Sequence, residues 1–357
     1  MSLGKYADAE EITRPIIENA ESLERMECGH VSTAMMLLIS IYKEQNRLQD
    51  AESEVFKYIE LQKRISDSGS RKELLAKSHL VDIYLLQGRY QEAETLGLEL
   101  VETAKLKDPE DISTFVAIGA LGSTYMYLGN LPKAEELFHE AVTDTKRIFG
   151  HDHRETIRYM NRLGNVYSLQ GRLTEAYDLF KDLLPIAIRK FGARHPESLS
   201  VMQSIGCMYW EDGGWLEGET IMRKILKARQ EIFGMDNHKA FMPMEPLLNM
   251  LREKGQFLEA EEFATVFLDS SKKASGSGHP QTLRIMQSLA SIWKARGKTT
   301  DAVDLLSECI KLRQQVSPKD HSDTRLAIDL LESWSSESLV PDVAYAGQDD
   351  DSKSPVD

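Results

Sequence analysis

The stretch LGNVYSLQGRLTEA, residues 163–176, carries the pattern that decides the fold: Tyr167, then Gly171 four residues later, then Ala176 five residues after that. The same pattern returns along the chain at steps of 41 or 42 residues. Its glycine position holds Gly4, Asn46, Gly88, Gly129, Gly171, Gly213, Gly255 and Gly297. A fixed period of this length indicates a repeat array, in which each unit buries its apolar face against its neighbours.

The two other positions of the pattern keep the same period. The small position holds Ala9, Ala51, Ala93, Ala134, Ala176, Gly218, Ala260 and Ala302. The large position, four residues before the glycine, holds Tyr42, Tyr84, Tyr125, Tyr167, Tyr209, Leu251 and Trp293. Because three positions share one period over most of the chain, the repetition does not arise by chance.

Each unit is predicted to be a pair of antiparallel helices. A period of about 42 residues also fits four-stranded propeller blades, so the local pattern has to decide. Apolar residues in 156–171 recur at Ile157, Met160 and Leu163, which is helical spacing, and 173–191 shows the same spacing. No run alternates as a strand does. The sequence therefore predicts an all-α protein, with a helix A and a helix B joined at the glycine position.

The loops between units carry a second set of periodic residues. Helix B is expected to end at Phe149-Gly150 and its equivalents, where glycine can adopt the left-handed conformation that closes a helix. Asp152 and Glu155 are predicted to form a capping pair at the next helix A. A histidine stands in each of five such loops: His153, His195, His238, His279 and His321.

The combined pattern, G-x-x-H-P-x-T followed by L-[GA]-x-x-Y-x-x-x-G-x-x-x-[ED]-A-E, resembles the 42-residue tetratricopeptide repeat of kinesin light chains. The resemblance spans roughly residues 1–334 and is best from Phe149 to Ala176. The sequence pattern is also similar to that of the repeat arrays in fungal NLR-like, nucleotide-binding immune proteins. The resemblance implies a right-handed tetratricopeptide-repeat superhelix, an α-solenoid whose A helices line a concave groove.

The expected domain organisation follows from the phase of the repeats. Residues 1–334 are predicted to form the array: a half repeat with a B helix at 5–24, seven whole hairpins and a final A helix. Residues 335–357, with acidic Asp349, Asp350 and Asp351, are expected to be a disordered tail. Because no A helix precedes the first B helix, its apolar side is expected to mediate self-association or to mark a longer polypeptide.

Composition and motifs exclude several functional classes. The net charge of −14 and the lack of basic patches argue against a nucleic-acid partner. No apolar run of membrane-spanning length and no signal peptide occurs, which predicts a cytoplasmic protein without a membrane partner. Cys28, Cys207 and Cys309 lie far apart and read as reduced thiols.

Enzyme signatures are also missing from the sequence, so no catalytic residue and no cofactor is predicted. His151-Asp152-His153 has the residue types of a metal site. However, His153 belongs to the histidine position that recurs on separate hairpins, which lie about 10 Å or more apart. These histidines are therefore predicted to serve the loop architecture and not to bind a metal.

The face of helix A opposite its core is the predicted binding surface. Asn161 and Asn165 point about 160° away from Leu163 and lie one turn apart. Amide side chains suit an extended peptide, because one amide can donate to a backbone carbonyl and accept from a backbone N–H. Amides are absent from the equivalent positions of the N-terminal hairpins, so binding is expected between residues 150 and 295. The predicted peptide-binding set is Arg158, Asn161, Arg162, Asn165, Gln203, Asn249, Arg284 and Gln287. The alternative is that these polar residues only face water.

The sequence as a whole predicts a non-catalytic protein-binding scaffold that captures a peptide or partner helix in the concave groove. Its negative charge is expected to favour partners with basic segments by long-range steering. The alternative is the ligand-sensing arm of a larger fungal NLR-like protein, without its ATPase domain.

Overall fold

The computed structural model describes residues 3–22, 29–66, 69–234, 240, 244–316 and 322–337. Within these ranges the chain forms sixteen α-helices and no strand, which confirms the all-α prediction. The helices are α1 (Leu3–Ser22), α2 (Gly29–Glu44), α3 (Leu48–Ile65), α4 (Arg71–Leu86), α5 (Tyr90–Lys107), α6 (Ile112–Tyr127), α7 (Leu131–Phe149), α8 (Arg154–Leu169), α9 (Leu173–Phe191), α10 (Pro196–Glu211), α11 (Trp215–Phe233), α12 (Met244–Glu253), α13 (Phe257–Ser275), α14 (Pro280–Ala295), α15 (Thr299–Val316) and α16 (Ser322–Glu337). Of the predicted tail at 335–357, residues 335–337 belong to α16 and residues 338–357 lie outside the described residues, as do His238 and His321.

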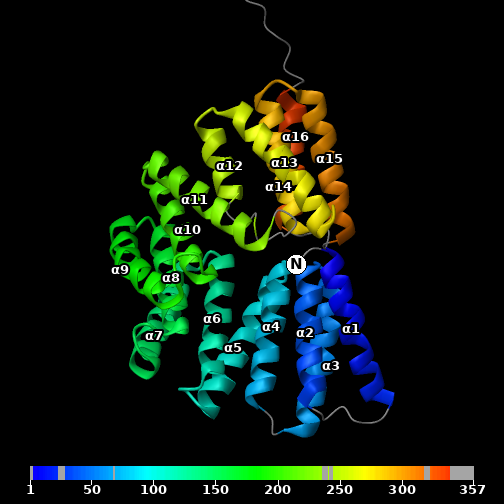
Figure 1. The fold of residues 1–357 in the computed structure, drawn as a ribbon, viewed down its shortest axis with the longest axis vertical. Coiled ribbons are helices and arrows are strands. Elements are labelled where there is room, and N and C mark those ends of the chain that lie inside the picture. The colour runs from blue at the N-terminus through cyan, green and yellow to red at the C-terminus, as the bar shows by residue number, and fades with distance from the viewer. Residues whose placement is uncertain are drawn as a thin grey trace, which may run out of the picture.

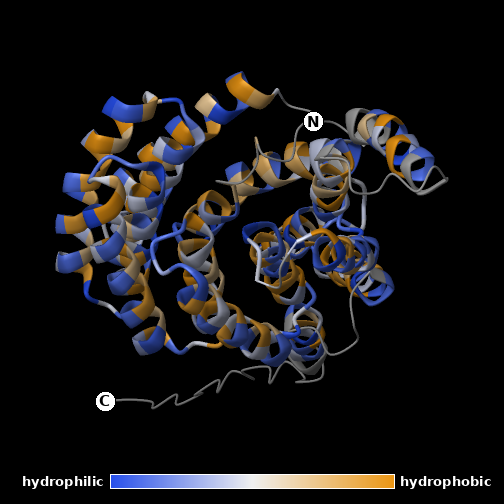
Figure 2. Cartoon of the chain, turned by 90° about the horizontal axis from the view of Figure 1, so that it is seen from below, coloured by the Kyte–Doolittle hydropathy of each residue, from blue (hydrophilic) through white to orange (hydrophobic). Residues whose placement is uncertain are grey.

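The helices stack as antiparallel hairpins into a curved solenoid (Figure 1). Even-numbered helices from α2 are the A helices and odd-numbered ones the B helices. A helices of successive hairpins also contact each other, as α4 does α6, α8 does α10 and α12 does α14. The A helices thus lie on the inner side of the curve, where neighbouring units come closest. Figure 2 shows this curved path from below.

The glycine position forms the turn between helices A and B. At Gly171 the backbone has φ 75°, and the N–H groups of Gly171 and Arg172 donate to the carbonyls of Ser168 and Tyr167 at 2.8 and 2.9 Å. This is the Schellman pattern that closes a helix with a left-handed residue. Asn46, the one non-glycine at this position, also has positive φ, at 58°, which asparagine tolerates better than most residues.

Complementary side-chain sizes bring helices A and B together. From Ala51 onward the alanines of the small position, such as Ala176, are fully buried. On helix A of the same hairpin, a β-carbon at Gly164 would lie only 2.6 Å from the ring of Phe180 on helix B. At Gly218 a β-carbon would lie 2.9 Å from the backbone oxygen of Gly206. Helix α11 therefore approaches α10 more closely than an alanine would permit.

The histidine position caps the A helices. The Nδ1 atoms of His153, His195 and His279 accept from the backbone N–H two residues later, at 3.3, 3.2 and 3.2 Å. The predicted capping pair of Asp152 and Glu155 was wrong: His153 is the N-cap, and Asp152 pairs with Lys190 at 3.1 Å. A side-chain acceptor one residue before the helix satisfies one of the free N–H groups of its first turn.

The buried apolar residues form three clusters and not one continuous core. The first runs from Ile17 to Met208, the second from Leu199 to Cys309, and the third lies under α15 and α16. The first two meet at α10, which contributes to both. The array also curves back on itself, because α13 reaches α1 (Figure 1).

Candidate functional site

A row of cavities follows the inner, A-helix side of the solenoid. One lies between α8 and α10, one joins α10, α12 and α14, and one joins α12, α14 and α16. All eight residues of the predicted peptide-binding set line these three cavities. The structure separates them into an α8 group (Arg158, Asn161, Arg162 and Asn165) and a C-terminal group (Gln203, Asn249, Arg284 and Gln287).

The cavity between α8 and α10 has a volume of about 490 Å³. Helix α8 contributes five polar side chains to its wall, and α10 contributes Glu197, Ser200 and Val201. Residues Arg154, Arg158 and Arg162 are spaced four apart, so all three lie on one face of the helix. Leu163, on the core side of α8, is buried, and Glu197 and Ser200 of α10 lie across the cavity from this row of arginines.

Asn161 is more enclosed than the sequence suggested. It was expected to project from the outer side of the helix, but only 9% of its surface is exposed. Its Nδ2 donates to Ser200 Oγ of α10 at 3.4 Å, while its Oδ1 is buried and has no hydrogen-bond partner among the described residues. Asn165, one turn further on, is half-buried. Asn161 therefore offers the cavity an unused acceptor, which normally costs free energy to bury.

The arginines of α8 differ in how their charges are matched. Arg154 pairs with Glu197 of α10 at 2.8 Å, and Arg158 pairs with Glu155 at 3.0 Å. Burial lowers the pKa of Arg158, but the charges of Glu155, Tyr159 and Glu197 and the hydrogen bond to Glu155 together outweigh it, so the net shift of the pKa is upward. Arg162 donates to Ser123 Oγ of α6 and forms no ion pair among the described residues. Burial, and then the charge of Arg158, lower the pKa of Arg162.

This local charge differs from the expectation drawn from the whole chain. Three arginines and two glutamates meet at the α8 wall, which leaves one net positive charge. The overall charge of −14 suggested partners with basic segments. The wall of this cavity instead favours an acidic or electron-rich group.

The C-terminal group lies in two connected cavities that share Asn249 and Arg284. Gln203 reaches the first, of about 490 Å³, together with Trp210 and Pro246. Gln287 reaches the second, of about 300 Å³. Arg284 Nη1 lies 3.5 Å from a carboxylate oxygen of Glu245, so its charge is matched. Burial and the nearby Glu211 raise the pKa of the Cys207 thiol to about 11, which keeps it protonated at neutral pH.

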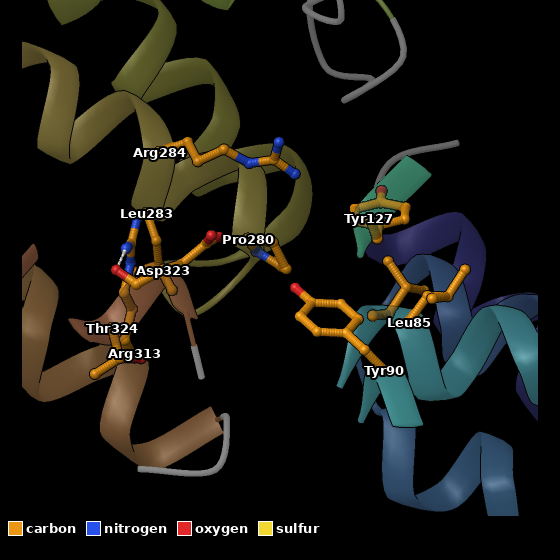
Figure 3. Close-up of a pocket in the computed structure, with 10 residues that line it drawn as sticks. Leu85, Tyr90, Tyr127, Pro280, Leu283, Arg284, Arg313, Asp323 and Thr324 are labelled. Carbon is orange, nitrogen blue, oxygen red and sulfur yellow. Dashed lines mark hydrogen bonds between the residues drawn. The ribbon is translucent and has the colours of Figure 1, made fainter. Parts of the chain in front are cut away.

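A smaller cavity lies where the two ends of the array approach each other (Figure 3). Tyr90 and Tyr127, whose rings stack at 5.9 Å, face Pro280 and Asp323 across a space of about 130 Å³. Figure 3 shows the tyrosines and the C-terminal residues on separate groups of helices. This seam bounds the inner side of the solenoid at one end.

The described residues do not provide a metal site: no three His, Cys, Asp or Glu side chains among them converge on one point. Nor does any helix in the described part of the chain have the length and apolarity needed to cross a bilayer.

Family models for the tetratricopeptide repeat match residues 113–189, 160–231 and 282–323. These segments are tetratricopeptide repeats. They contain α8, α10 and α14, and with them most of the residues that line the cavities. The tetratricopeptide-repeat prediction is therefore confirmed, while no observation concerns the similarity to fungal NLR-like arrays.

Several solved structures are similar to this chain. NprR, solved in complex with its cognate peptide NprX, aligns over 94% of this chain and 97% of its own, with a TM-score of 0.57 and 14% identity. A putative kinesin light chain from Podosopora anserina, described as nearly identical TPR-like repeats, aligns over 56% of this chain and 95% of its own, with a TM-score of 0.46 and 20% identity. BtubC (BKLC) from P. vanneervenii aligns over 75% of this chain and 91% of its own, with a TM-score of 0.47 and 15% identity. No curated protein sequence matches the chain at a significant level.

Several residues that line the cavities were not predicted from the sequence. Arg154 could have been found, since it lies one turn before Arg158 on the same face. Ser200 and Glu197 could not, because their importance comes from the distance between α8 and α10. Trp210 was not predicted because the repeat pattern singles out its neighbour Tyr209.

Proposed function

We propose that this chain is a non-catalytic, cytoplasmic scaffold that binds an extended peptide segment of a partner protein along its inner face. The observation that carries the proposal is Asn161 Oδ1, a buried acceptor that has no hydrogen-bond partner in the described part of the chain and lies in the wall of a polar cavity of about 490 Å³. A peptide N–H group is the natural donor for such an atom.

The arrangement of the other amides supports the same function. Asn165, Gln203, Asn249 and Gln287 line successive cavities on the A-helix side. An extended peptide presents alternating donors and acceptors, so amides spaced along its path can hold its backbone while the cavities accept its side chains. NprR was solved with a bound peptide, which offers a precedent for peptide binding on this fold.

A peptide selected from a random library against the wild-type chain provides the ligand for the test. Asn165→Ala and Asn249→Ala should each weaken its binding about fivefold, the effect of one lost hydrogen bond of roughly 1 kcal/mol. Gln91→Ala, at an exposed site on α5, is the matched control and should bind normally. Isothermal titration calorimetry gives the affinities, and circular dichroism checks that each variant is folded. Unchanged affinity in both inner-face variants would show that the peptide binds elsewhere.

Asn161 needs a separate variant, because it also contacts Ser200. Asn161→Asp keeps the acceptor and the size of the side chain but loses the Nδ2 donor, whereas Asn161→Ala loses both. If the buried Oδ1 accepts from the peptide, Asn161→Asp retains more affinity than Asn161→Ala. The sensor-arm alternative in a larger nucleotide-binding protein draws no support from the described residues.

A further inference from the structure

A fourth inner cavity lies between α4, α6 and α8, next to the one between α8 and α10. Its volume is about 300 Å³, and the two cavities share Arg158 and Arg162 as a common wall. Helix α6 contributes Val116 and the three small residues Gly119, Ala120 and Ser123 to its wall, and the small residues leave room for the cavity. Gly119 also has a packing role, since a β-carbon there would lie 3.1 Å from the ring and the hydroxyl of Tyr159.

Basic residues flank this cavity on both sides. His79 of α4 and Arg162 of α8 occupy the same repeat position, nine residues before Gly88 and Gly171, and Ala120 holds that position between them. Burial, and then the charge of Lys43, lower the pKa of His79, so the imidazole is neutral at pH 7. The carboxylate of Asp82 lines the same cavity, but it pairs with Lys43 at 2.9 Å.

Among the described residues, one positive charge in this cavity therefore forms no ion pair. Arg158 pairs with Glu155 and Asp82 pairs with Lys43. Arg162 donates to the hydroxyl of Ser123 and lies with its guanidinium carbon 5.8 Å from the ring centre of Phe138, and the charges of Asp82 and Glu155 act on it without a direct ion pair. A partly enclosed cation without an anion is unfavourable, because it loses hydration and gains no ion pair. Contact with an aromatic face replaces only part of that loss.

We propose that the cavity between α4, α6 and α8 is an oxyanion site, in which the guanidinium groups of Arg162 and Arg158 hold a carboxylate or phosphate group. Guanidinium groups bind both kinds of oxyanion through paired N–H donors. The hydroxyl of Ser123 lies beside Arg162 as a further polar partner. The site needs no peptide backbone, so it goes beyond the proposed peptide function and can be tested without a peptide.

The test measures thermal unfolding and calorimetric binding of the wild-type chain with sodium phosphate, sodium acetate or sodium chloride at matched ionic strength and neutral pH. Phosphate or acetate should raise the melting temperature in a saturable way beyond the effect of chloride. A response to phosphate alone assigns a phosphoryl group, and a response to acetate alone assigns a carboxylate. A response to both supports an oxyanion site that accepts either. No response to either anion overturns the proposal.

Variants separate binding at this site from general salt effects. Arg162→Met should weaken anion binding on the order of tenfold or more, because charged hydrogen bonds are lost. Arg147→Met on α7, whose arginine lines none of these cavities and is paired with Glu110 and Asp144, should keep the wild-type response. In sodium chloride alone, Arg162→Met should have a melting temperature equal to or above that of the wild type. In the anion that stabilises the wild type, phosphate or acetate, Arg162→Met should melt below the wild type. An equal anion response in wild type and Arg162→Met would refute the assignment.

Arg162→Lys keeps the test valid if the methionine variant does not fold. Lysine retains the charge but lacks the forked donors, so its anion affinity should fall between wild type and no binding. Undiminished binding in Arg162→Lys together with Arg158→Lys would also contradict the site. Loss of peptide binding in Asn165→Ala would leave this result untouched, so the two proposals fail independently.

Discussion

Arg172 links two neighbouring hairpins by placing its guanidinium 4.3 Å from the ring centre of Tyr167 while donating to Glu135 of the preceding B helix at 2.7 Å. The same combination occurs at Arg47 with Glu10 and at Arg89 with Glu52. We call this arrangement the arginine staple. The staple connects the residue after the turn position to the B helix of the previous repeat. It therefore contributes to the stability of the interface between successive hairpins.

Glu135→Gln should make the stability of the chain less dependent on pH. The hydrogen bond from Arg172 holds the pKa of Glu135 below its usual range. A carboxylate with a lowered pKa stabilises the fold above its unfolded pKa of about 4.3, and this contribution is lost as pH falls through the folded value. At neutral pH the variant should lose about 0.5–1 kcal/mol, as exposed pairs do.

Chemical denaturation of wild type and Glu135→Gln at several pH values measures this difference. It should be present at pH 7 and shrink toward zero below about pH 4. Glu136→Gln, at the exposed neighbouring position, is the control and should follow the wild type. A difference that stays constant on acidification would mean that the pair with Arg172 is not its source.

The junction between α9 and α11 lacks both charged partners of the staple and should be the weakest in the array. Tyr177 stands where the staple has its glutamate, and Gly214 stands at the position that holds Arg47, Arg89 and Arg172 in three other repeats. Tyr177 instead meets the ring of Tyr209 edge-on at 6.3 Å. The first two core clusters also meet at this junction. Hydrogen exchange should therefore show faster opening of α10 and α11 than of α6 and α8.

Introducing a charged pair at the α9–α11 junction also tests whether the missing staple weakens it. Tyr177→Glu with Gly214→Arg should slow exchange in α10 and α11 and raise the melting temperature relative to Tyr177→Glu alone. A β-carbon at residue 214 would lie 3.2 Å from the backbone oxygen of Tyr209, so a slight shift of the turn is required. Slower exchange in α10 and α11 than in α8 of the unchanged chain would contradict a weak junction.

His195→Ala should cost about 1 kcal/mol, because α10 loses its side-chain cap. His195→Asn keeps an acceptor at the N-cap and should recover part of the loss. Recovery should be incomplete, since the imidazole also stacks on Phe191 at 4.8 Å. Thermal unfolding compares the three chains, and equal stability of the alanine and asparagine variants would show that the cap contributes nothing.

Ile12 and Ile16 give α1 an exposed apolar side, with 69% and 44% of their surfaces exposed in the described part of the chain. We predict association of two copies through this side. Light scattering should show a mass that rises with concentration in the wild type and stays monomeric in Ile12→Glu/Ile16→Glu. Leu216→Glu, at an equally exposed leucine on α11, is the control. A wild-type chain that remains monomeric at high concentration would refute the prediction.

The sequence determined the helices, their order and the face of each helix that enters the core. These features depend on local chemistry: glycine at residue 171 closes a helix, alanine at residue 176 permits close packing, and apolar spacing of Ile157 and Met160 defines a buried stripe. Each such signal lies within one hairpin, and the period repeats it, so a single chain contains several copies of the same evidence. The inner-face residues could be named for the same reason.

Only the tertiary structure decided how those inner-face residues are used. Asn161 is enclosed because α10 brings Ser200 to it from 39 residues away. Arg162 forms no ion pair among the described residues because α6 offers it only the hydroxyl of Ser123 and the carboxylate of Asp82 pairs with Lys43. Helical periodicity fixes the direction of a side chain from its own axis but not the distance to the next repeat. That distance is set by the packing of whole hairpins, so burial, ion pairing and cavity shape emerge only when the repeats are assembled.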